Sequence, residues 1–152
     1  MSERIAFRRD GASEAQIADH LLRCDASFVP PLSGRADVYA YARKIASNAT
    51  RFEAWDRALV GLLAAYCNDE KRVAAYITSV SVVDGWRGRG IASRLLEQCI
   101  EHARVREFQR VELEVDGENV SAIRLYTQNG FVIAAADGRT STMRLDLGKG
   151  TK

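Results

Sequence analysis

Hydrophobic residues recur at every third or fourth position in several stretches of the chain, a spacing that predicts helices. The pattern is clearest over residues 90–104, where Ile91, Leu95 and Cys99 lie on one face and Glu97 lies on the other. A capping box, which marks a helix start, is matched at Ser13–Gln16. We therefore expect helices that begin at Ser13, near Ala36 or Asp37, at Gly90 and at Asn119, the last one ending before Gly130.

Alternation of hydrophobic and polar residues predicts strands elsewhere. Residues 110–115 place three aliphatic side chains on one face and Glu112 and Glu114 on the other. Other apolar runs are separated by short polar turns, which is typical of antiparallel strands. The expected strands are Ile5–Arg8, Arg51–Trp55, Ala58–Cys67, Val73–Val83, Arg110–Val115, Phe131–Ile133 and Thr142–Leu145.

The elements follow one another in the order β-α-α-β-β-β-α-β-α-β-β, which predicts an α/β protein with a mixed (α+β) sheet. Phe28–Gly34 forms a loop between the first two helices, because Pro30 and Pro31 each remove a backbone donor. At 152 residues, 47% of them apolar and 28% charged, the chain suits one domain. We place that domain at residues 1–147 and expect a flexible tail at 148–152.

Charge and hydropathy exclude several classes of protein. No apolar run reaches the ~20 residues that a membrane span needs, and the start has no apolar segment of the signal-peptide kind. We expect a cytoplasmic protein that binds no membrane. The net charge of +2 comes from 22 basic and 20 acidic residues spread along the chain, so nucleic acid is not an expected partner.

The cysteines and histidines do not form a metal site by their spacing. Cys24, Cys67 and Cys99 are far apart in the sequence, and no two of them form a CxxC pair. We therefore interpret them as buried thiols. His20 and His102 are expected to be partly buried helix residues. Cys99 and His102 are separated by one helical turn, but two ligands do not make a zinc site. We expect no metal.

A glycine-rich junction predicts an anion site. The strand that ends near Val82 runs into Gly85–Gly90 and then directly into a helix. Glycines let backbone N–H groups approach phosphate oxygens, and the first turn of a helix favours negative charge. Arg87 and Arg89 add positive charge. A solvated surface turn is the plain alternative.

Two other nucleotide motifs fit this junction poorly. Gly88-x-Gly90-x-x-Ser93 resembles the dinucleotide fingerprint loosely, but the third glycine is absent and a meander precedes the segment. A phosphate loop of the G-x-x-x-x-G-K-[ST] type is not matched, because no lysine follows a glycine at that spacing.

Arg87-x-x-Gly90-x-Ala92 resembles the acetyl-CoA signature of the GNAT family of N-acetyltransferases, [QR]-x-x-G-x-[GA]. Leu113-Glu114-Val115, Asn119, Ala122-Ile123, Leu125-Tyr126 and Gly130-Phe131 resemble the family's second conserved stretch in order and spacing. The two matches cover residues 73–131, and the element order is similar to the family's. The first third of the chain matches only in its elements.

The resemblance implies a GNAT-like acyl-CoA N-acyltransferase fold and acetyl-CoA as cosubstrate. Two parallel strands would diverge to open a slot in which cosubstrate and acceptor meet end to end. The pyrophosphate would be bound by the segment from Arg87 to Ala92, the pantetheine arm would pair with one strand, and Asn119 would hold that arm. The cofactor-binding residues implied are Val80, Ser81, Val82, Arg87, Gly88, Arg89, Gly90, Ile91, Ala92 and Asn119.

The resemblance also implies two catalytic residues. Tyr126 is similar to the family's tyrosine that assists the departing sulfur; core packing is its plain alternative. An amine with a pKa of ~10.4 must lose a proton before it can attack, and Glu114 is the leading base. Glu112, Ser79 and Ser81 are the other candidates for the base, and a chain of water molecules is a further alternative.

The function expected is transfer of an acetyl group from acetyl-CoA to a primary amine by direct attack in a ternary complex. The alternative is a non-catalytic acyl-CoA-binding or sensing module of the same fold. Small amines, amino sugars and protein amino groups all stay open as acceptors, and a homodimer stays open as the assembly. Phe28–Arg35, Tyr39 and Tyr41 are expected to line the acceptor side.

Overall fold

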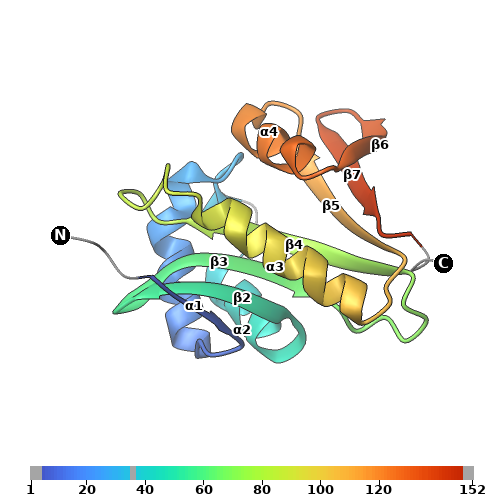
Figure 1. Ribbon diagram of the computed structural model, residues 1–152. Coiled ribbons are helices and arrows are strands. Elements are labelled where there is room, and N and C mark those ends of the chain that lie inside the picture. Colours follow the sequence, from blue (N-terminus) through green and yellow to red (C-terminus); the bar gives the residue numbers. More distant parts are fainter. Residues whose placement is uncertain (1–4, 35–36, 149–152) are drawn as a thin grey trace.

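The computed structural model describes residues 5–34 and 37–148. One mixed sheet forms the centre of the molecule, with strands in the order β1-β2-β3-β4-β5-β7-β6 (Figure 1). Among the strands of the described residues, only β4 and β5 pair in parallel. The strands are β1 (Ala6–Arg9), β2 (Thr50–Asp56), β3 (Ala58–Tyr66), β4 (Ala74–Val82), β5 (Arg110–Asp116), β6 (Val132–Asp137) and β7 (Thr140–Asp146).

Helices cover both faces of the sheet. The helices are α1 (Glu14–Cys24), α2 (Val38–Asn48), α3 (Ile91–Val105) and α4 (Val120–Gln128), and two short 3-10 turns, η1 (Asp25–Ser27) and η2 (Leu32–Gly34), lie between α1 and α2. One core cluster joins the sheet to α3 and α4, and a second cluster joins it to α1 and α2. This arrangement confirms the predicted mixed sheet and the predicted order of elements.

The helix starts follow from their capping residues. Ser13 and Gln16 form the predicted capping box of α1, and the Asp37 carboxylate accepts hydrogen bonds from two backbone N–H groups at the start of α2. Asn119 caps α4 by accepting from the backbone N–H of Ala122. Ala36, the other expected start of α2, lies outside the described residues, as do Arg35 and residues 149–152 of the expected tail.

A buried carboxylate fixes the start of α1 on the sheet. Glu53 of β2 is fully buried and accepts hydrogen bonds from the backbone N–H groups of Gly11 and Ala12 and from the indole N–H of Trp55. The Arg51 guanidinium lies 3.5 Å away and compensates its charge. Helix α1 therefore has a defined position over β2 and β3.

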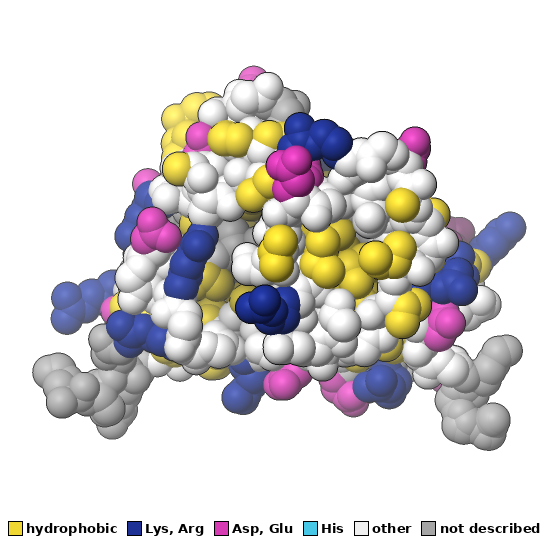
Figure 2. Space-filling view, turned by 90° about the horizontal axis from the view of Figure 1, so that it is seen from above, with side chains coloured by type: hydrophobic (Ala, Val, Ile, Leu, Met, Phe, Trp, Pro, Cys, Tyr) yellow, Lys and Arg dark blue, Asp and Glu magenta, His cyan; other side chains and the backbone are white. Residues whose placement is uncertain are grey.

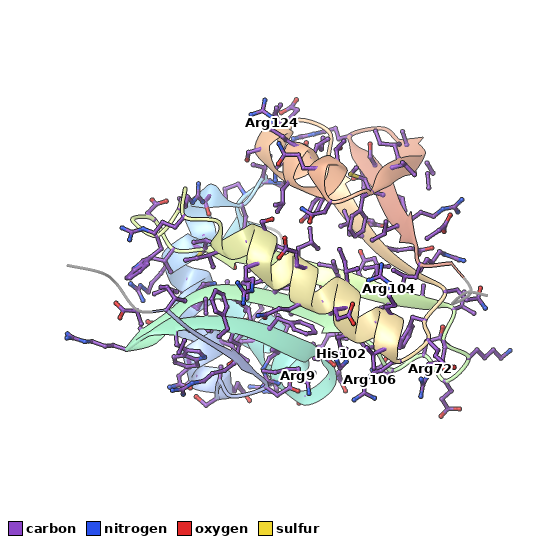
Figure 3. The ribbon with its side chains drawn as sticks, in the orientation of Figure 1. Arg9, Arg72, His102, Arg104, Arg106 and Arg124 are labelled. Atoms are coloured by element: carbon purple, nitrogen blue, oxygen red, sulfur yellow. The ribbon has the colours of Figure 1, made fainter. Side chains whose placement is uncertain are left out.

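Cysteines and histidines depart in part from the sequence interpretation. Cys24 and Cys99 are buried as expected, whereas Cys67 is only partly buried. His20 is fully buried, more than expected. His102 is half-buried on α3, where its Nδ1 atom lies 3.0 Å from the Arg9 guanidinium of β1 (Figure 3).

Two further expectations concern the molecular surface. Within residues 5–34 and 37–148, no helix is long and apolar enough to cross a membrane. Strand β6 is an edge strand whose residues are all exposed, including Val132 and Ile133. Figure 2 shows hydrophobic side chains gathered over the end of the molecule that carries α4 and β6. Such an edge could pair with another chain, but the homodimer stays a prediction.

Candidate active site

The two parallel strands separate partway along their length. β4 and β5 pair only from Ala74 with Arg110 to Ile77 with Leu113. Beyond that point β5 stays paired with β7 as far as Asp116, while β4 continues to Val82 against β3 alone. The backbone of β4 from Thr78 onward therefore has no strand on its β5 side, and the two strands form an open wedge (Figure 1).

A cavity of about 390 Å³ fills this wedge. Nine of the ten expected cofactor-binding residues line it; the exception is Arg89, which lies against the Trp86 ring. The cavity runs from the loop before α3, past the free edge of β4, to the first turns of α4. Its lining also includes residues that the sequence did not nominate for the cofactor: Ser27, Phe28, Trp86, Ser93, Ser121, Ala122 and Leu125.

The loop before α3 has the backbone of an anion site. Gly88 and Gly90 have φ values of 78° and 79°, which other residues rarely adopt, and a Cβ at either position would meet no atom within 4 Å. Gly90 is the N-cap of α3 and offers no side-chain cap, so the first N–H groups of α3 remain available. Arg87 lies at the rim and is half-exposed, 3.4 Å from the Asp84 carboxylate. A phosphate group fits this arrangement.

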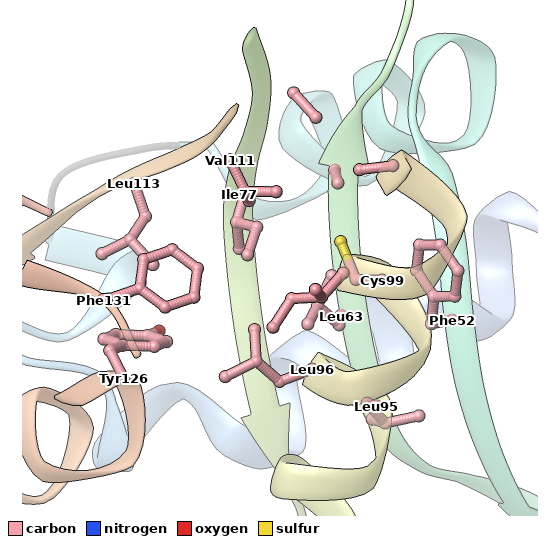
Figure 4. Packing of buried hydrophobic residues seen from close by; sticks show 14 of the residues in the cluster. Phe52, Leu63, Ile77, Leu95, Leu96, Cys99, Val111, Leu113, Tyr126 and Phe131 are labelled. Atoms are coloured by element: carbon pink, nitrogen blue, oxygen red, sulfur yellow. The ribbon is translucent and has the colours of Figure 1, made fainter. Parts of the chain in front are cut away.

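Tyr126 stands at the inner end of the cavity. The centroid of its ring lies 5.8 Å from the centroid of the Phe131 ring, and Figure 4 shows both rings beside Leu113. Burial raises the pKa of Tyr126 to about 12, so the hydroxyl keeps its proton at neutral pH. The side chain borders both this cavity and a second one.

The second cavity, of about 120 Å³, meets the first at shared walls. Phe28, Val80, Asn119, Ala122 and Tyr126 line both cavities. The smaller cavity extends to the other side of the sheet, where Phe28, Val29, Leu32 and Tyr41 of the α1–α2 segment cover it.

Glu114 lines this smaller cavity, and no described residue forms an ion pair with it. Glu112 does not line it and is paired with Arg110. The two glutamates of β5 therefore differ, because only Glu114 has a carboxylate at the junction that forms no ion pair with a described residue. Tyr39, which the sequence assigned to the acceptor side, lies instead in a surface groove between α1 and α2 and is 59% exposed.

A β-bulge at Thr78 changes the face to which the following residues of β4 point. Ile77 pairs with Ala65 and Ser79 pairs with Ala64, so Thr78 has no partner on β3. Paired residues point to the same face. Because Ala65 belongs to the core under α3 and Ala64 to the core under α1 and α2, Ile77 and Ser79 face opposite sides of the sheet.

Ser81, two residues further on, is held by His20 of α1. The Nδ1 atom of His20 lies 2.9 Å from the carbonyl oxygen of Leu59, which can only accept, so Nδ1 carries the proton. Nε2, 2.8 Å from the Ser81 hydroxyl, therefore accepts from it. Burial lowers the pKa of His20 to about 4, so the ring is neutral near pH 7. No sequence pattern pointed to this contact.

Comparisons with known proteins show the family and the fold. The sequence model of the acetyltransferase (GNAT) family matches residues 16–131. An uncharacterized N-acetyltransferase of Methanocaldococcus jannaschii is 42% identical over 76 residues, which cover 47% of this chain and 34% of that protein. The spermine/spermidine N(1)-acetyltransferase of Bacillus subtilis is 29% identical over 75 residues, 49% of each chain. The match thus spans half or less of the length of these relatives.

Among solved structures, the paiA N-acetyltransferase of Thermoplasma acidophilum, in complex with coenzyme A, is similar with a TM-score of 0.72. The two are 15% identical, and the superposition covers 94% of this chain and 99% of the other. This likeness concerns the fold.

Proposed function

The chain belongs to the GNAT family of acetyltransferases, and on that premise we propose that it transfers an acetyl group from acetyl-CoA to a primary amine. One observation carries the proposal. A large cavity that begins at an uncapped helix N-terminus meets a small cavity at Tyr126, inside the wedge between β4 and β5. Two substrates that enter from opposite sides of the sheet would meet there end to end.

The chain's own groups suit acetyl-CoA in the larger cavity. The backbone N–H groups from Gly88 to Ala92 receive the pyrophosphate, assisted by the dipole of α3. The free edge of β4 from Val80 to Val82 pairs with the amides of the pantetheine arm as an added strand would. Asn119, whose side chain already caps α4, borders the path of that arm.

Direct attack by the amine fits the cysteines of the chain. A covalent route needs a thiolate, but burial raises the pKa of Cys24 to about 11 and also raises the pKa values of Cys67 and Cys99. None of the three thiols is activated as a nucleophile. The acceptor therefore attacks the thioester itself, in a ternary complex.

Glu114 receives the proton that the amine must lose. Its carboxylate borders the small cavity, from which the acceptor approaches, and it has no competing cation among the described residues. Tyr126 acts on the other side of the reacting carbon. A phenol with a pKa of about 12 is a poor proton donor to a thiolate whose own pKa is ~8.5, so Tyr126 stabilises the sulfur by a hydrogen bond.

The experiment is an acceptor screen with the purified protein. Release of free CoA thiol from acetyl-CoA is followed in the presence of small amines, polyamines, amino sugars and peptides, and CoA binding is measured by calorimetry. Binding together with thiol release that depends on an amine supports the proposal. Binding without release under every condition would instead indicate the non-catalytic acyl-CoA-binding module.

A further inference from the structure

One buried hydroxyl beside the small cavity has no partner. Ser79 is 7% exposed, and its Oγ atom makes no hydrogen bond to any residue that the structure describes. Its neighbours differ, because the Thr78 hydroxyl contacts Tyr41 and the Ser81 hydroxyl donates to His20. Buried hydroxyl groups almost always have partners, since an unpaired one reduces stability. At the wall of a cavity, such a hydroxyl can find its partner on a water molecule or on a ligand that replaces that water.

The position of Ser79 shows on which side that ligand lies. Ser79 lines the small cavity but not the large one, whereas Val82 and Ser81 line only the large one. The bulge at Thr78 turns Ser79 toward the α1–α2 face, the side from which Phe28, Leu32 and Tyr41 cover the small cavity. Ser81 faces the same side further along β4, where it meets His20. The partner of the Ser79 hydroxyl is therefore on the acceptor rather than on the acyl donor.

The rest of the small cavity restricts the acceptor further. Phe28, Val29 and Leu32 give it an apolar wall, and about 120 Å³ admits only a small group beside the reacting nitrogen. The free Glu114 carboxylate repels an acceptor that carries its own carboxylate at this place. A hydroxyl can both donate and accept a hydrogen bond, so it suits an uncharged polar group.

We propose that Ser79 selects acceptors in which an uncharged hydrogen-bonding group, a hydroxyl or an amide, stands on the carbon next to the one that bears the amine. An alkyl group at that place leaves the buried hydroxyl unpaired, and a carboxylate is repelled by Glu114. The proposal rests on the acetyl transfer proposed above and specifies its acceptor.

Four amines that share one skeleton test it: alaninol, alaninamide, sec-butylamine and alanine. The value of kcat/KM is measured for each with wild type, Ser79→Ala and Ser79→Thr, which keeps a hydroxyl. The wild type should prefer alaninol and alaninamide, and Ser79→Ala should reduce that preference over sec-butylamine by roughly tenfold. The ratio of kcat/KM between two amines is compared from one variant to the next, so the different basicities of the amines cancel. Ser79→Thr should restore part of the preference.

Ser81→Ala is the matched control on the same strand. It should raise the KM for acetyl-CoA and leave the preference among the four amines unchanged. A second measurement, thermal stability, does not depend on enzymatic activity. Because the Ser79 hydroxyl has no internal partner, Ser79→Ala should have a Tm equal to or above that of the wild type.

The outcomes separate this proposal from the proposed function. If wild type acetylates the amines and Ser79→Ala lowers all four rates by the same factor, acetyl transfer stands and the role of Ser79 is wrong. A preference for alanine, or a Tm several degrees lower in Ser79→Ala, would also overturn that role. If none of the four amines is acetylated while another amine of the acceptor screen is, acetyl transfer stands and the acceptor proposed here is wrong.

Discussion

The Tyr41 hydroxyl donates a hydrogen bond, 2.8 Å long, to the carbonyl oxygen of Thr78, the bulge residue of β4. Helix α2 is thereby attached to the strand at the point where β4 leaves β5. The same bond places the Tyr41 ring at the wall of the small cavity. The position of α2 and the shape of the acceptor side are therefore coupled.

Tyr41→Phe should disturb the acceptor side only. Loss of the hydrogen bonds to the Thr78 carbonyl and to the Thr78 hydroxyl should lower the free energy of unfolding by about 1 to 3 kcal/mol. It should also raise the KM of the amine severalfold and leave the Kd of CoA unchanged. Tyr39→Phe, two residues away on the exposed face of α2, should match the wild type. Equal effects of the two substitutions on the KM would contradict the coupling.

His20 should make stability depend on pH. Its pKa is about 4 in the folded protein, below the usual 6.5, because of burial. As the pH falls below 6.5, His20 becomes protonated in the unfolded chain but stays neutral in the folded protein. The free energy of unfolding should therefore be level above that pH and fall by roughly 3 kcal/mol on the way to pH ~4. Urea denaturation of wild type and His20→Gln checks this, and the variant should lose less stability over the same range. An identical pH dependence would mean that His20 titrates normally.

Gly90→Glu should abolish CoA binding, because it places bulk and negative charge at the proposed pyrophosphate site. The Kd measured by calorimetry should rise by roughly 100-fold or more. Gly138→Glu is a matched control, since Gly138 also has a positive φ, of 64°, and open space around its Cβ position, but lies in the β6–β7 turn. Comparable weakening in both variants would show that backbone strain, and not the site, is responsible.

Glu114→Gln should lower kcat by roughly 10²-fold with no change in the Kd of CoA. Raising the pH should restore part of the rate, because more of the amine is then unprotonated. Glu112→Gln is the control, since Glu112 is paired with Arg110 and does not line the cavity. Similar small losses in both variants would assign the proton to water instead.

The sequence was sufficient for much of the fold because its signals are local. The capping box at Ser13 and the periodicity of Ile91, Leu95 and Cys99 depend only on neighbours in the chain, and the corresponding helices are present. The resemblance carried by Arg87-x-x-Gly90-x-Ala92 supplied the family, which patterning alone does not give.

What the sequence could not predict depends on distant residues. The contact between His20 and Ser81 joins positions 61 residues apart, and nothing near either residue indicates it. The bulge at Thr78 interrupts an alternation that looks regular, so the side of the sheet that Ser79 faces could not be read from its position. Tyr39 and Tyr41 look alike in sequence, and only the rotation of α2 about its axis decides which of them reaches the cavity.

The most direct test of acetyl transfer at the Tyr126 junction follows an isotopic label from the acetyl group of acetyl-CoA. Labelled product and free CoA are counted by mass spectrometry with wild type and Tyr126→Phe, using an amine identified in the acceptor screen. We predict one labelled amine for each CoA released, and a kcat lower by roughly 10- to 10³-fold in Tyr126→Phe at unchanged CoA affinity and Tm. Release of CoA without labelled amine, or equal kcat values for the two proteins, would contradict the account.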